Sequence, residues 1–160
     1  MAAPFSFPLP ADAVPRPALD ALERELVGAT LAPLPSGQHG GRFLGWVDAR
    51  GARRRRVRVV DTILFRALRW GLDLDARRWW FEHPALAVGH FRIEEGPSRW
   101  RPTRVLQLHY EGSRLPIAHM LYDELLPLSD GRVLGIGGLN APRGEGDHFL
   151  FALEPMAPVR

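Results

Sequence analysis

The chain has 160 residues, of which 46% are hydrophobic and 24% charged, and its formal net charge is +3. This length and composition predict one globular domain with a core of its own, and no apolar run approaches the roughly 20 residues of a membrane helix. All 21 cationic residues are arginine and cysteine is absent, which excludes lysine Schiff bases, P-loop lysines, thiol nucleophiles, thiolate metal sites and Fe–S clusters.

The N-terminal region changes character at Pro17. Residues 1–17 hold five prolines, which deny the backbone helix and sheet hydrogen bonds, so we expect an extended arm. The start lacks the basic and apolar segments of a signal peptide, and we therefore expect a cytoplasmic protein. From residue 18 the leucine spacing predicts an amphipathic helix that ends near Gly28. We expect one domain over residues 18–155, followed by a tail at 156–160.

The remaining chain has the pattern of consecutive antiparallel strands. Short runs rich in aromatic and branched residues are separated by Gly, Pro and Asp turn formers. We expect strands at residues 40–48, 79–83, 86–94, 105–110, 114–122, 121–125, 132–139 and 149–153. Residues 59–70 fit a helix closed by Gly71 or a strand equally well. The prediction is a mainly β fold, an antiparallel barrel of about seven or eight strands with one or two short helices, because closure removes exposed edges.

Two groups of motifs resemble a known family. The first is Gly41-Arg42-Phe43-Leu44-Gly45, and the second combines Tyr122-Asp123 with Pro127, Asp130 and Val133-Leu134-Gly135. Their order over residues 37–153 resembles the GXWXG-type family of poorly characterised calycin-like proteins, although Phe43 replaces the family's Trp. The resemblance implies a small lipocalin-like barrel with a lipophilic ligand. It carries over Gly41, Phe43, Gly45, Tyr122 and Asp123 and assigns no catalytic residues.

Strand alternation predicts which side chains would line an interior. One face of 105–110 holds Leu106, Leu108 and Tyr110, while Gln107 and His109 share the other face. Our first interpretation places the apolar faces inward, and the alternative turns the His90/Arg92 and Gln107/His109 faces toward a polar interior. The expected apolar lining is Phe91, Leu106, Leu108, Tyr110, Tyr122, Phe149 and Phe151, with Arg92, Arg101 or His109 at the polar end.

Candidate catalytic groups are few. Asp123 beside Tyr122 and the imidazole of His109 are the candidates for acid–base chemistry. Asp123 and Glu124 are neighbours and so cannot act as a pair from one strand, and we expect Asp123 to close a turn and Glu124 to lie in solvent. The six histidines lack metal-ligand spacing, so we expect neither a metal nor a cofactor, with a single axial histidine for haem as the remaining alternative. The glycines at 135–138 suit bulges and turns.

Three functions follow from these patterns. The first is the binding of a hydrophobic or amphipathic small molecule inside the barrel. The second is an isomerase- or cyclase-type enzyme on the same barrel, with Asp123 or a histidine as acid and base. The third uses the arginine clusters 53–56 and 99–104 to bind nucleic acid. The near-neutral charge makes a solvated, arginine-rich surface the preferred interpretation of those clusters.

Overall fold

The structure is a computed structural model. It describes residues 21, 24–25, 27–28, 30–47, 68–111, 121–129, 131–139 and 148–156. The arginine cluster 53–56 and residues 114–120 of the strand predicted at 114–122 lie outside the described residues, as does the N-terminal arm.

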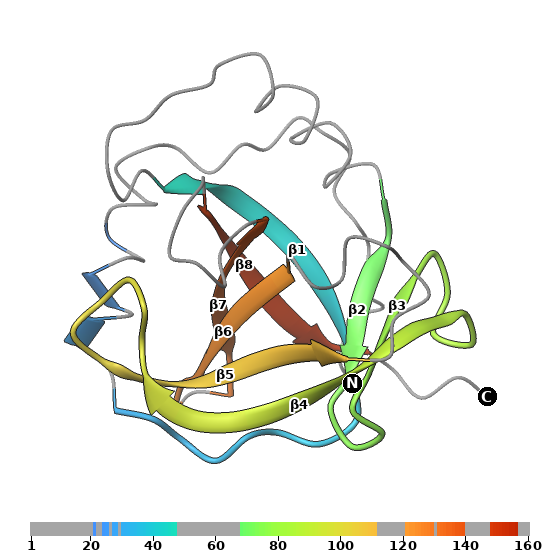
Figure 1. The fold of residues 1–160 in the computed structure, drawn as a ribbon, viewed down its shortest axis with the longest axis horizontal. Helices are drawn as coiled ribbons and strands as arrows, with labels where there is room; N and C mark the ends of the chain where they lie inside the picture. The colour runs from blue at the N-terminus through green and yellow to red at the C-terminus, as the bar shows by residue number, and fades with distance from the viewer. Residues whose placement is uncertain are drawn as a thin grey trace.

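Eight antiparallel strands close into a barrel in which each strand pairs with its neighbours in sequence and β1 pairs with β8 (Figure 1). The strands are β1 (Gln38–Val47), β2 (Trp70–Asp73), β3 (Arg78–Phe81), β4 (Ala87–Pro97), β5 (Arg104–Glu111), β6 (Leu121–Pro127), β7 (Val133–Leu139) and β8 (His148–Pro155). The predicted mainly β fold with a closed antiparallel barrel is therefore confirmed.

Among the described residues, irregular pairing occurs at two places in the barrel wall. The register shifts between Phe43 and Gly45 where β1 pairs with β8, and between Trp79 and Trp80 where β3 pairs with β4. Such bulges increase local bend and twist, which a closing sheet requires. Gly71 on β2 adds close packing, since a Cβ there would overlap the Trp80 ring.

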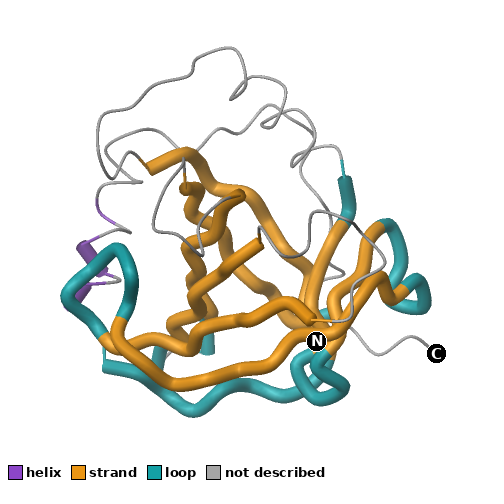
Figure 2. The backbone as a smooth tube through the Cα atoms, in the orientation of Figure 1, coloured by secondary structure: helices purple, strands orange, loops and turns teal. Residues whose placement is uncertain are grey.

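Alternating side chains form an apolar layer on each side of the wall. The inner layer, here called the interior cluster, has a core of Phe43, Leu72, Leu74, Trp79, Phe91, Leu108, Leu125, Val133, Phe149, Phe151 and Leu153. The outer layer consists of Leu44, Leu126, Leu128, Leu134, Ile136, Leu150 and Ala152, against which Leu31 and Trp100 pack. Figure 2 shows that the segment leading into β1 and the loop between β4 and β5 run outside the strands. The segment before β1 contributes Leu31 to the outer layer, and the loop between β4 and β5 contributes Trp100.

Two segments in the N-terminal half can be compared with the sequence-based prediction. Ala21, Arg24–Glu25 and Val27–Gly28 are helical, within or next to the predicted helix. Trp70 and Gly71 belong to β2, so this end of the ambiguous segment is strand and Gly71 does not close a helix, while residues 59–67 lie outside the described residues. Among the described residues, no helix has the length and hydropathy of a membrane span.

Candidate functional site

The two acids of β6 point to opposite sides of the barrel wall. Leu121 and Leu125 pack with the interior cluster, and Asp123 between them shares that face. Glu124 faces the outer layer with Leu126. The expectation that Asp123 closes a turn and Glu124 lies in solvent is wrong, because Asp123 is in the middle of a paired strand and Glu124 is only 2% exposed.

Asp123 forms a pair with Tyr110 inside the barrel. The Tyr110 hydroxyl donates a hydrogen bond to Asp123 Oδ2. Tyr110 comes from β5, where it shares the inward face with Leu106 and Leu108. Gly137 on β7 is the register partner of Asp123, and a Cβ on this glycine would overlap Asp123 Oδ1 and lie 3.3 Å from Phe149 Cζ. The carboxyl group therefore occupies the space that Gly137 leaves open.

Burial controls the electrostatics of this pair. It raises the pKa of Asp123 to about 7; the hydrogen bond from Tyr110 opposes that rise and the nearby Glu124 adds to it. Burial also raises the pKa of Tyr110 well above its ordinary value, with Asp123 contributing. Tyr110 thus remains a neutral donor, and Asp123 exchanges its proton near neutral pH.

Aromatic rings surround the Tyr110 side chain. Trp79 and Phe91 meet its ring edge-to-face at centroid distances of 5.3 and 6.2 Å. Phe149 lies beside Gly137, and the centroid of its ring is 5.6 Å from that of Phe43. Trp79 is 5% exposed, and its indole N–H has no hydrogen-bond partner within the described part of the chain. The Tyr110–Asp123 pair is therefore set in an aromatic wall that contains one more hydrogen-bond donor.

The pair also keeps some accessible surface. Tyr110, Leu121 and Asp123 face inward but are only partly buried, whereas Leu108 and Leu125 on the same strands are fully buried. Protein atoms nevertheless surround Tyr110 and Asp123 densely enough that burial dominates both pKa values. Tyr110 and Asp123 are thus largely desolvated while part of their surface remains accessible.

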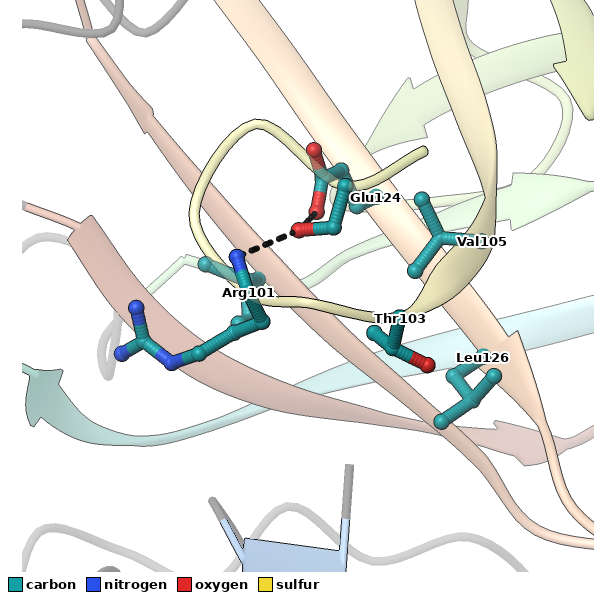
Figure 3. A pocket seen from close by; sticks show the side chains of 7 residues that line it. Arg101, Thr103, Val105, Glu124 and Leu126 are labelled. Carbon is teal, nitrogen blue, oxygen red and sulfur yellow. Dashed lines mark hydrogen bonds between the residues drawn. The ribbon is translucent and has the colours of Figure 1, made fainter. Parts of the chain in front are cut away.

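On the outer side, Glu124 anchors the loop between β4 and β5. Its carboxylate accepts hydrogen bonds from Ser98 Oγ (2.5 Å), the Arg99 amide (2.7 Å) and the Tyr122 hydroxyl (2.9 Å). Ser98 Oγ accepts a hydrogen bond from the Arg101 amide at 3.0 Å. Figure 3 shows that the Arg101 guanidinium is directed away from Glu124. A small pocket here is lined by Ser98, Arg101, Thr103, Val105, Glu124, Leu126 and Ile136. Glu124 thus already accepts hydrogen bonds from three donors of the protein.

Tyr122 is held between the same loop and β5. The centroid of its ring lies 5.4 Å from that of Trp100 and 5.8 Å from that of His109. The Arg99 guanidinium carbon lies 4.0 Å from the same centroid. His109 Nε2 lies 3.7 Å from a carboxylate oxygen of Glu94. Burial raises the pKa of Tyr122 and of Glu124 above their ordinary values. These contacts join the loop to the barrel wall.

The structure divides the predicted site residues into two groups. The interior brings together Asp123, Phe91, Leu106, Leu108, Tyr110, Phe149 and Phe151. Tyr122, His109, Arg92 and Arg101 lie on the outer side, and the Arg92 side chain is 57% exposed and paired with Glu94. The two candidate catalytic groups, Asp123 and His109, are therefore on opposite sides of the wall. The interpretation that placed apolar faces inward is the one the structure adopts. The expectation that Tyr122 lines the interior is wrong, because Tyr122 alternates with Asp123 along β6 and its ring packs on Trp100 outside the wall.

Three residues that contribute contacts here have no such role in the sequence-based prediction. The sequence predicts only a strand at Trp79 and solvent exposure at Glu124. It also predicts a bulge or turn at Gly137, whereas β7 pairs with both neighbours in regular register. One signal was available for the glycines, since Gly135 and Gly137 alternate along a strand and so leave space on one face. A Cβ on Gly135 would overlap the Phe151 ring.

No protein-family model, curated protein or solved structure matches this chain. The chemistry of the site must therefore come from the residues themselves. Within the described ranges, no cluster of three His, Asp or Glu side chains is suited to hold a metal ion. The chemically distinctive feature is an inward-facing carboxyl group with a phenol donor in an aromatic lining.

Proposed function

We propose that the barrel interior binds a small molecule with an apolar body, and that Asp123 and Tyr110 hold its polar group. The proposal includes membership of the GXWXG-type family, which is supported by the motif resemblance alone. Phe91, Phe149 and Trp79 would form the apolar walls around the ligand.

The observation that carries this proposal is the Tyr110–Asp123 pair inside an otherwise apolar cluster. Removing a carboxyl group from water costs several kcal/mol unless partners compensate it. Among the described residues, Asp123 receives one hydrogen bond, from a neutral donor, and its raised pKa indicates incomplete compensation. An apolar side chain would fill a purely structural position more favourably, so this carboxyl group is best explained by a ligand.

The exposed surface of the inward side chains supports the same site. Tyr110, Leu121 and Asp123 are adjacent on β5 and β6 and keep accessible surface although they face inward. Ligand sites are mostly apolar concavities with a few convergent polar groups, which matches this combination. The outer pocket is a weaker candidate because the Glu124 carboxylate is already bonded to three donors.

Calorimetric titration with octanol tests the proposal. We expect one octanol site in the wild-type protein, lost in Leu121→Trp, which fills the interior beside the pair. Leu86→Trp is the matched control, because Leu86 is 60% exposed on the surface and should leave binding unchanged. Native mass spectrometry of freshly purified protein should also detect a co-purifying molecule. No octanol site, or equal binding by both variants, would contradict the proposal.

Acid–base catalysis on a bound molecule is a second candidate. One observation favours it: the pKa of Asp123 is about 7, which suits a group that takes and returns a proton at neutral pH. Its test is to incubate the co-purifying molecule with wild type and with Asp123→Asn and to compare the products by mass and chromatography. A molecule recovered unchanged from the wild-type protein would refute catalysis while leaving binding intact.

A further inference from the structure

We propose that the polar group recognised inside the barrel is a protonated amine, with the Asp123 carboxylate as its counter-ion. This inference rests on the proposed binding function and narrows its ligand to an apolar organic cation. The site would thus differ from one for fatty acids or other anionic amphiphiles. Such anions would suit the polar end predicted from the sequence, which consists of Arg92, Arg101 or His109.

Asp123 has no positive partner in the part of the chain that the structure describes. Its one hydrogen bond there comes from the neutral Tyr110 hydroxyl to Oδ2. Oδ1 lies over Gly137, beside Phe149 Cζ. An ammonium group offers up to three donors and a full positive charge, so it satisfies Oδ1 and compensates the carboxylate at the same time.

The positions of the described arginines support the same ligand charge. Arg42 and Arg78 alternate with the inward residues Phe43 and Trp79, so they point outward, where they form ion pairs with Glu154 and Asp73. Arg92 likewise pairs with Glu94 outside, Arg101 lines the outer pocket, and Arg104 is an exposed partner of Glu95. The other described arginines, Arg24, Arg69, Arg77, Arg99 and Arg132, are exposed, so within the described residues the interior cluster receives no guanidinium that could bind an anion.

The lining is also suited to a cation. Tyr110 and Trp79 lie in edge-to-face contact, and Phe91 and Phe149 extend the aromatic surface around the pair. Aromatic faces carry partial negative charge and attract alkylammonium groups within about 6 Å. A carboxylate ligand would instead meet the negative charge of Asp123, with Glu124 adding to it from the other side of the wall.

A matched series of octyl compounds tests the inference. Octylamine, octanol and octanoate share one tail and differ in head-group charge, and calorimetry at about pH 8 keeps the amine protonated and Asp123 mostly ionised. We expect octylamine to bind about tenfold to a hundredfold more tightly than octanol, as for a hydrogen bond to a charged group. Octanoate should bind more weakly than octanol.

Two variants locate the effect. Asp123→Asn should remove the preference for octylamine, and its cooperative unfolding in urea reports that the barrel is folded. Glu94→Gln removes one negative charge from the exposed outer face of β4 and should keep the full preference. Octanol binding without an amine preference, or a preference that survives Asp123→Asn, overturns the amine assignment alone. Failure of both octanol and octylamine to bind contradicts the proposed function as well.

Discussion

Replacing Asp123 with Asn should change how the stability of the barrel depends on pH. The pKa of Asp123 is about 7 in the folded chain, against an ordinary value of 3.8. The folded state therefore holds this proton at pH values at which the unfolded chain has lost it. The resulting stabilisation is fully present below about pH 4 and is lost as pH rises through about 7.

The size of the effect follows from the same two values. Their separation of about three pKa units corresponds to about 4 kcal/mol of unfolding free energy. By linkage, about 3 kcal/mol of this loss falls between about pH 5 and pH 8. Asparagine retains a carbonyl oxygen to accept the Tyr110 hydroxyl and does not titrate, so the variant lacks this loss.

Urea unfolding of ligand-free wild type and Asp123→Asn at several pH values measures the effect. The difference in unfolding free energy between the two proteins is the relevant quantity, because contributions from other groups such as His39 and Glu124 largely cancel in it. We expect the unfolding free energy of the variant, relative to that of the wild type, to rise by about 3 kcal/mol as pH rises from about 5 to 8. A difference that stays constant with pH would refute the argument that Asp123 is a buried, uncompensated carboxyl group.

Three further substitutions test individual contacts, each by urea unfolding. Gly137→Ala introduces a Cβ that overlaps Asp123 Oδ1 and should destabilise the barrel by about 1–3 kcal/mol, with octylamine binding impaired; unchanged stability and binding would count against this packing. Tyr110→Phe keeps the ring but removes the donor to Asp123, and should cost about 1–2 kcal/mol, more above pH 7 than below it; a loss that is larger at low pH would contradict the pairing. Ser98→Ala removes one donor from buried Glu124 and should cost about 1–3 kcal/mol without altering octanol binding; loss of octanol binding would place the ligand on the outer side.

The barrel was predictable because its physical signals are local. Alternation in Val105–Tyr110 separates the inward face of Leu106, Leu108 and Tyr110 from the outward face, and each strand pairs with its neighbours in sequence, as in a meander. The aromatic interior residues Phe91, Phe149 and Phe151 were recognised by the same alternation. The periodicity of the sequence was therefore enough to predict the fold and the apolar part of the candidate site.

The polar part of the site depends on contacts across strands, which periodicity does not report. Asp123 could be placed beside Tyr122 in sequence, but its partner Tyr110 comes from the neighbouring strand, and its space comes from Gly137 on the other side. Glu124 looked like a solvent-exposed acid because its donors, Ser98 and the Arg99 amide, come from a distant loop. The burial of these two carboxyl groups follows from contacts between distant segments and leaves no local pattern in the sequence.

A crystal structure of the protein grown with octylamine would show whether the barrel interior holds an amine. We expect the octyl tail inside the barrel among the aromatic side chains, with the ammonium nitrogen within about 3 Å of the Asp123 carboxylate. Density for octylamine only on the outer surface, or an interior completely filled by protein side chains around Tyr110 and Asp123, would contradict it.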